Sequence, residues 1–121
     1  MNAEELKVRT KQFAIRIIKF VQVLPKSSEA QVIGKQLLRS GTSVAANYRA
    51  VCRSRSNPEF IAKMGTVIEE ADETAFWLEL LDEASITSDH VGPLLREAGE
   101  LVKIFAASRL TASRRNLKSE I

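Results

Sequence analysis

The sequence contains few of the residues that form cross-links or catalytic centres. It has one cysteine, Cys52, and one histidine, His90. A single cysteine excludes an intrachain disulfide and suits a reducing compartment. No apolar run approaches the roughly 18 residues that a transmembrane helix needs, and the N-terminal segment lacks the apolar core of a signal peptide. We therefore expect a cytoplasmic protein that does not associate with membranes.

Turn signals are also scarce, because the chain has only three prolines and five glycines. Apolar residues instead recur at the spacing typical of amphipathic helices. The expected helices cover about residues 3–24, 28–54, 57–84 and 88–113. The remaining segment, 114–121, is polar and is expected to fray. The sequence therefore predicts an all-α protein, an up-down-up-down antiparallel four-helix bundle in which residues 1–121 form one domain.

Residues that favour helix starts mark the beginning of three of these segments. Ser28 opens a capping-box pattern at the second segment. At the third segment Asn57 is the expected N-cap because a proline follows it, and Ser56 is an alternative cap. Ser88 is the expected cap of the fourth segment. Pro93 would then fall where the first intrahelical donors are needed, so either the regular helix starts nearer Gly92 or its first turn is distorted.

The expected core is formed by apolar stripes along all four segments. Small residues fill the centre of the second segment, around Gly41, where glycine costs up to about 1 kcal/mol relative to alanine. Such a centre indicates close approach to another helix, either inside the bundle or in another subunit. Phe76 and Trp77 widen the third stripe and are expected in the core or at a subunit interface, and a platform for base stacking is the alternative. The stripe residues are Leu6, Phe13, Ile17, Phe20, Leu24, Ile33, Leu37, Val44, Tyr48, Val51, Phe60, Met64, Val67, Ala71, Leu78, Leu81, Leu94, Leu95, Ala98, Leu101, Val102 and Phe105, with Ile18 and Val21 widening the first stripe.

Charge is segregated along the chain although the net charge is only +3. Residues 1–55 carry eleven Lys or Arg and three Asp or Glu, whereas residues 56–100 carry two and eleven. Residues 101–121 are basic again, with five against one. Either the basic and acidic helices lie side by side and neutralise each other, or part of the basic surface stays free for an anionic partner.

The basic residues of the first two segments are candidates for binding RNA or DNA. Arg49 and Arg53 are four residues apart and therefore share a helix face, and Arg55 follows at the helix end. Contacts of this kind with phosphates are independent of base sequence and strongly dependent on salt. The full candidate set is Arg49, Arg53, Arg55, Lys7, Lys11, Arg16 and Lys19.

Arg39 interrupts a stretch of small and apolar residues in the second segment. We expect it to form an ion pair with Glu73 or Asp72 of the third segment, and an exposed arginine is the alternative. Ser43 and Asn47 are expected to be buried and to bond across helices. The expected structural polar set is therefore Arg39, Ser43, Asn47 and Glu73.

No set of residues suggests catalysis, a metal or a cofactor. Glu69, Asp72 and Glu73 could share a face, but a di-metal bundle also needs paired Glu-x-x-His motifs, which are missing. Cys52 is expected to be a small packed hydrophobic residue, and the alternative is a thiol activated by neighbouring arginines. We therefore expect a protein that is not an enzyme and has no catalytic, metal-binding or cofactor-binding residues.

The spacing of several polar residues resembles the bacterial "four helix bundle protein" family. The pattern is Gln36-x-x-Arg39-Ser40-x-x-Ser43-x-x-x-Asn47, then Arg55-Ser56-x-x-Glu59-Phe60, then Glu73 followed by Trp77-Leu78. That family includes proteins encoded in intervening sequences of 23S ribosomal RNA genes and the accessory variability protein of diversity-generating retroelements. Many members follow the asparagine with Ile-Ala-Glu-Gly, where this chain follows Asn47 with Tyr48-Arg49-Ala50-Val51. Many also have Gly-Ser where this chain has Glu69-Glu70, and these differences resemble a sub-branch.

The resemblance implies a homopentameric ring of four-helix bundles. For the retroelement members it also implies a basic surface that engages nucleic acid and a nucleoprotein partner, a reverse transcriptase. We therefore expect a self-associating bundle that binds RNA, DNA or a nucleoprotein through its basic surface. A protein-binding or self-assembling scaffold without affinity for nucleic acid is the alternative.

Overall fold

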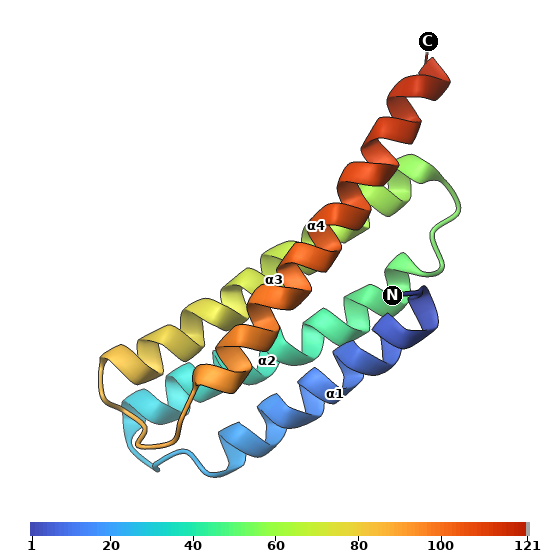
Figure 1. The fold of residues 1–121 in the computed structure, drawn as a ribbon. Coiled ribbons are helices and arrows are strands. Elements are labelled where there is room, and N and C mark those ends of the chain that lie inside the picture. The colour runs from blue at the N-terminus through green and yellow to red at the C-terminus, as the bar shows by residue number, and fades with distance from the viewer. Residues whose placement is uncertain (121) are drawn as a thin grey trace.

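The computed structural model describes residues 1–120, with side-chain placement given for residues 1–118 (Figure 1). Four helices account for most of this part of the chain, and it contains no strand: α1 (Ala3–Gln22), α2 (Ser28–Val51), α3 (Asn57–Glu83) and α4 (Gly92–Glu120). Consecutive helices run in opposite directions and are joined by short connections (Figure 1). The predicted all-α antiparallel four-helix bundle is thereby confirmed.

Side-chain oxygens cap the first three helices. Asn2 and Ser27 precede α1 and α2, and each accepts a bond from the backbone N–H three residues further on, at 2.8 and 3.3 Å. The prediction that Ser28 caps α2 was wrong by one residue, because Ser27 has the extended backbone of a cap and Ser28 is already helical. At α3 the alternative cap, Ser56, accepts from the N–H three residues on at 3.2 Å, so Asn57 lies inside the helix.

The connection from α3 to α4 begins with a compact C-terminal motif. Ser85 has a left-handed backbone with φ 54°, and its N–H donates to the Asp82 carbonyl at 3.0 Å. The Ile86 N–H donates to the Leu81 carbonyl, also at 3.0 Å, and the Ile86 side chain packs against the core. These two bonds form a Schellman motif, in which glycine usually holds the position of Ser85.

The fourth helix differs from the sequence prediction at both ends. It begins at Gly92, the alternative start, and the expected cap at Ser88 was wrong, because Pro93 suits a first turn, where its missing N–H has no partner to lose. It continues past residue 113 to Glu120, where fraying was expected. The last turns contain no helix breaker and project beyond the other helices (Figure 1). Ile121, the last residue of the expected tail, lies outside the described residues.

The core lies where the apolar stripes predicted it. The largest fully buried side chains come from all four helices: Phe13, Ile17, Leu37, Val44, Val51, Met64, Val67, Leu78, Leu81, Leu101 and Phe105. Tyr48 stacks on Phe105 with ring centroids 5.7 Å apart. Two residues that widen the stripes, Ile18 and Phe76, are exposed, with 37% and 51% of their accessible surface in solvent. Phe76 is therefore not a core residue of the bundle, and its expected place at a subunit interface stays a prediction.

The small residues of α2 bring it close to two neighbouring helices. A Cβ atom on Gly41 would lie only 2.8 Å from Cγ2 of Ile17 on α1. Next to it the buried Ser40 hydroxyl lies 2.9 Å from the Thr74 hydroxyl of α3. At these positions the close approach occurs inside the bundle rather than in another subunit.

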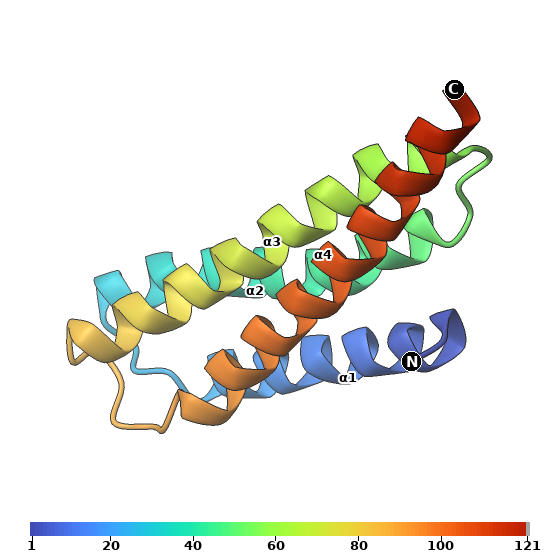
Figure 2. The same cartoon turned by 45° about the horizontal axis from the view of Figure 1, so that its top comes forward.

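The bundle is less tightly closed between its first and last helices. α2 packs extensively on α1 and α3, and α3 packs on α4, whereas α1 and α4 touch over a short length. The two helices diverge along the molecule (Figure 2). Arg9 bridges them through two bonds to the Glu97 carboxylate, both 2.7 Å long. The ion pair with Glu97 raises the pKa of Arg9.

Candidate nucleic-acid interface

An open groove of about 520 Å³ lies between the first half of α1 and the second half of α2. We call it the α1–α2 groove, and it is formed by Glu4, Lys7, Val8 and Lys11 of α1 and Thr42, Ala45, Ala46 and Arg49 of α2. The antiparallel arrangement of the two helices brings Arg49 to the same end of the bundle as Lys7 and Lys11. Alanines on α2 leave the space between the charged side chains open.

The α1–α2 groove carries an excess of positive charge. Lys7 pairs with Glu4 at 2.7 Å, in the preceding turn of the same helix. Lys11 and Arg49 are exposed and form no ion pair with any side chain in the described range 1–118. Two unpaired cations and one paired cation around a shallow apolar floor can hold phosphate groups without reading bases.

The other predicted basic residues lie outside this groove. Arg16 and Lys19 are exposed further along α1 and do not line it. Arg53 is exposed in the turn that follows α2. Arg55 lines a different cavity, described next. Of the seven predicted residues, Lys7, Lys11 and Arg49 line the groove, and the remaining four do not.

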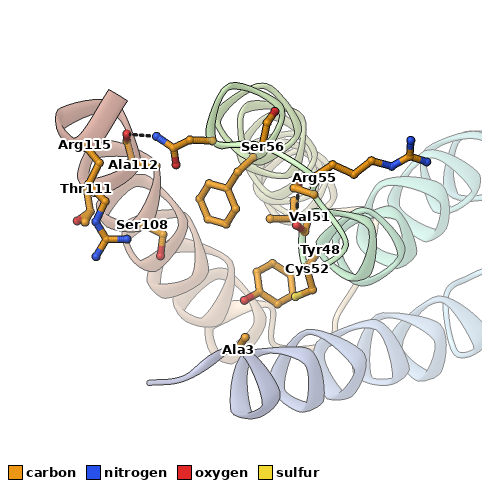
Figure 3. Close-up of a pocket in the computed structure, with 13 residues that line it drawn as sticks. Ala3, Tyr48, Val51, Cys52, Arg55, Ser56, Ser108, Thr111, Ala112 and Arg115 are labelled. Carbon is orange, nitrogen blue, oxygen red and sulfur yellow. Dashed lines mark hydrogen bonds between the residues drawn. The ribbon is translucent and has the colours of Figure 1, made fainter. Parts of the chain in front are cut away.

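A second cavity, of about 620 Å³, lies at the end of the bundle where α1 and α4 diverge (Figure 3). Tyr48 and Phe60 form part of its apolar wall. The guanidinium of Arg55 is directed away from this cavity (Figure 3). On the opposite side Asn57 donates a bond to the Ala112 carbonyl at 2.6 Å, which ties the start of α3 to α4.

Cys52 lines the same cavity and is exposed at the end of α2. The expectation that it is a packed hydrophobic residue was wrong, because α2 ends at Val51 and the thiol lies beyond the last buried turn. Tyr48, one turn earlier, is 5% exposed. Burial first, and then the neighbouring Cys52 thiol, raise the pKa of Tyr48.

Arg39 joins α2 to α3 through two carboxylates. Its guanidinium contacts Glu73 and lies 3.2 Å from Glu70, whereas Asp72, the other expected partner, is exposed. The Trp77 indole N–H donates to the same Glu73 carboxylate at 3.2 Å. The Arg39 bond first, and then the indole bond, lower the pKa of Glu73, while burial opposes them.

Ser43 and Asn47 do not play the role expected of them. Both are half-buried, and the Asn47 amide donates to the Ser43 carbonyl of its own helix at 2.9 Å. The buried polar contact between helices is instead the Ser40–Thr74 pair. Ser40 follows Arg39 in the family-like pattern, but a serine hydroxyl also bonds readily within its own helix, so its position carried no clear signal.

The described residues contain no group of three or more His, Cys, Asp or Glu placed to hold a metal ion. The acidic residues of α3 are divided instead, since Glu73 turns toward Arg39 and Glu69 and Asp72 face solvent. In the described part of the chain, every helix is too short or too polar to span a bilayer.

The fold and the basic groove define a small helical bundle with a candidate anion-binding surface. The family described as "23S rRNA-intervening sequence protein" matches residues 4–107, and the chain belongs to this family. The chain is also similar to a crystal structure of a protein of unknown function from the S23 ribosomal protein family of Bacteroides thetaiotaomicron. The two are 33% identical with a TM-score of 0.81, over 90% of this chain and 98% of the other. No curated protein matches the chain.

Proposed function

We propose that this protein is a non-enzymatic, self-associating helical bundle that binds nucleic-acid backbones, free or within a nucleoprotein, through the α1–α2 groove. The observation that carries the proposal is the convergence of Lys7, Lys11 and Arg49 on one open groove. Two of these three cations have no acidic partner in the described range 1–118. The description of the family, which refers to 23S rRNA, supports RNA as the first ligand to test.

The chemistry of the α1–α2 groove favours the phosphate backbone over the bases. No aromatic side chain lines the groove, so base stacking has no platform there. Binding would depend on the release of counterions from the nucleic acid. A plot of the logarithm of the affinity against the logarithm of the salt concentration would then have a negative slope of about 0.7 to 0.9 for each contacted phosphate.

The test is a double substitution, Lys11→Gln with Arg49→Gln, assayed by fluorescence anisotropy with a structured RNA at several salt concentrations. We expect affinity for unrelated sequences to fall by about tenfold or more and the salt slope to decrease by about 1.4 to 1.8. Lys26→Gln with Lys35→Gln is the matched control, because both lysines are exposed and lie outside the groove. An equal loss in the control pair, or an unchanged slope in the groove pair, contradicts the proposal.

The family resemblance supports a homopentamer as the assembly, and light scattering of the purified protein measures its mass. A scaffold that binds only proteins is the second candidate function. It is favoured by Phe76, an aromatic side chain with half of its surface in solvent. A protein that assembles but ignores RNA at low salt would support the scaffold.

A further inference from the structure

The outward face of α3 combines carboxylates with one exposed aromatic ring. Glu69, Asp72, Phe76 and Glu79 follow one another at steps of three, four and three, so they form one stripe on the helix. All four are exposed, and Phe76 keeps 51% of its surface in solvent. None of the three carboxylates forms an ion pair with a side chain in the described range 1–118. We call these four residues the α3 stripe.

The α3 stripe exposes the apolar surface of an aromatic ring between negatively charged groups. Phe76 packs edge-on against Trp77 with ring centroids 5.0 Å apart, but the 51% of its surface that remains in water gains nothing from its apolar area. A partner that covers this part of the ring would remove it from water. The carboxylates around the ring select a partner that carries positive charge. Among the side chains of residues 1–118 the stripe has no such partner, since Arg39 is occupied by Glu70 and Glu73 on a different side of α3.

The α1–α2 groove matches the α3 stripe in charge and polarity, and it matches the Asp72–Glu79 part of the stripe in length. Its floor is apolar or small, with Val8 60% exposed and the alanines of α2 beside it, and its cations are Lys7, Lys11 and Arg49. On α2 the groove extends from Thr42 to Arg49, which at 1.5 Å per residue is about 10 Å. The part of the stripe from Asp72 to Glu79 covers the same number of residues, again about 10 Å, and Glu69 lies one turn beyond it.

We propose that the α3 stripe of one copy docks into the α1–α2 groove of a second copy. Phe76 then lies on the floor of the groove, and the carboxylates of the stripe lie against Lys11 and Arg49. The two surfaces belong to different helices of the chain, so the contact is heterologous and a docked pair still offers one free stripe on one copy and one free groove on the other. Such a contact closes into a ring or extends as a filament.

The docked stripe would also regulate the proposed function, and this part rests on that function. Carboxylates of the second copy would occupy the same cations that bind phosphates. Nucleic acid and the second copy would therefore compete for the groove, and added RNA would release one copy from the other.

The first test compares Phe76→Ala with Leu110→Ala by sedimentation velocity over a range of protein concentrations. Leu110 is the matched control, because it lies on α4 and also keeps 51% of its surface exposed. We expect Phe76→Ala to raise the concentration for half-association by at least tenfold and Leu110→Ala to leave it unchanged. Wild-type protein that stays monomeric, or association lost in the control alone, overturns the proposal.

A charge exchange tests the pairing of the two surfaces directly. One variant carries Asp72→Lys with Glu79→Lys, and the other carries Lys11→Glu with Arg49→Glu. We expect each to associate poorly alone and an equimolar mixture to recover association. Helical circular dichroism checks that both are folded. Variants that associate as wild type, or a mixture no better than its components, overturn the proposal.

RNA binding separates this inference from the proposed function. Phe76→Ala should bind RNA more tightly than wild type at concentrations where wild type is associated, because its grooves are free. If Phe76→Ala associates normally while Lys11→Gln with Arg49→Gln loses RNA, the docking is wrong and the proposed function stands. If Phe76→Ala dissociates while the groove pair keeps its RNA affinity, the docking stands without the competition.

Discussion

Because Gly41 has no side chain, α1 and α2 pack close together at this position. Ile17 fills the space where a Cβ would lie, and it is completely buried. A glycine in the middle of a helix costs up to about 1 kcal/mol in helix propensity. The close packing that it permits offsets this cost.

We therefore expect Gly41→Ala to destabilise the protein by about 1 to 3 kcal/mol, because the new methyl group overpacks a filled site. Gly99→Ala is the matched control, since Gly99 is also helical and exposed and has no atom within 4 Å of its added Cβ. The control should gain up to about 1 kcal/mol from helix propensity. Urea denaturation measures both, and an equal gain in the two variants would contradict the close contact at Gly41.

For single residues, the sequence predicted contacts between charged groups better than contacts between hydroxyl groups. Arg39 stood out because it interrupts a stretch of small and apolar residues, and the structure pairs it with Glu73. Ser40 and Thr74 were not predicted as partners, since a hydroxyl can bond within its own helix wherever it lies. For the same reason Asn47 satisfies its amide locally and needs no partner across the bundle.

At the scale of the elements, helix ends depend on geometry that single residue types specify weakly. Ser27 and Ser28 are chemically identical as caps, and only the extended backbone of Ser27 decides between them. The segment after residue 113 contains neither a glycine nor a proline, so no residue type marked an end of α4 near that position. The helix interiors were predictable, because the apolar spacing repeats over many turns.

The α3–α4 connection contains a residue whose replacement should stabilise the fold. Ser85 holds a left-handed backbone, which costs about 1 kcal/mol or more for a residue with a Cβ. Its N–H and that of Ile86 close the Schellman motif, and a glycine keeps both bonds. We expect Ser85→Gly to raise the free energy of unfolding by about 0.5 to 1 kcal/mol.

Thermal denaturation followed by circular dichroism measures this gain. Ser88→Gly is the control, because Ser88 lies in the same connection without a left-handed backbone. It should give no gain, since there glycine only adds freedom to the unfolded chain. A gain of equal size in the control would mean that the connection as a whole favours glycine and that Ser85 carries no particular strain.

For the whole molecule, both interpretations of the segregated charge describe part of the structure. Arg39 and Arg9 are neutralised by acidic residues of α3 and α4. Lys11 and Arg49 are exposed and unpaired within the described range 1–118, and so are the carboxylates of the α3 stripe. The sequence predicted the imbalance but not this division, because which charges meet depends on how the helices are rotated about their axes.

The contact between α1 and α4 should depend on one ion pair. Glu97 is 16% exposed, so Arg9→Gln would leave a largely buried carboxylate with a weaker partner. We expect a cost of about 1 to 2 kcal/mol, between the values typical of exposed and buried pairs. Lys103→Gln is the control, because its pair with Glu100 is exposed and 3.8 Å long, and it should cost less than about 0.5 kcal/mol.

Denaturation measures both costs, and amide hydrogen exchange shows where the structure opens. In Arg9→Gln the exchange of α1 should accelerate more than that of α3, because α1 loses its link to α4. Uniform acceleration across all four helices would show that the ion pair stabilises only the global fold and has no local role at this contact.

The sparse contact between α1 and α4 also bears on how the chain reaches its native state. Nearly all packing between helices joins neighbours in the sequence, so the contact order is low and little loop entropy is spent before contacts form. Folding can therefore begin with the hairpin of α2 and α3 and add α4 and α1 in either order. During synthesis on the ribosome, α1 can pack against α2 before α4 has emerged, so the N-terminal half need not wait for the chain to be complete.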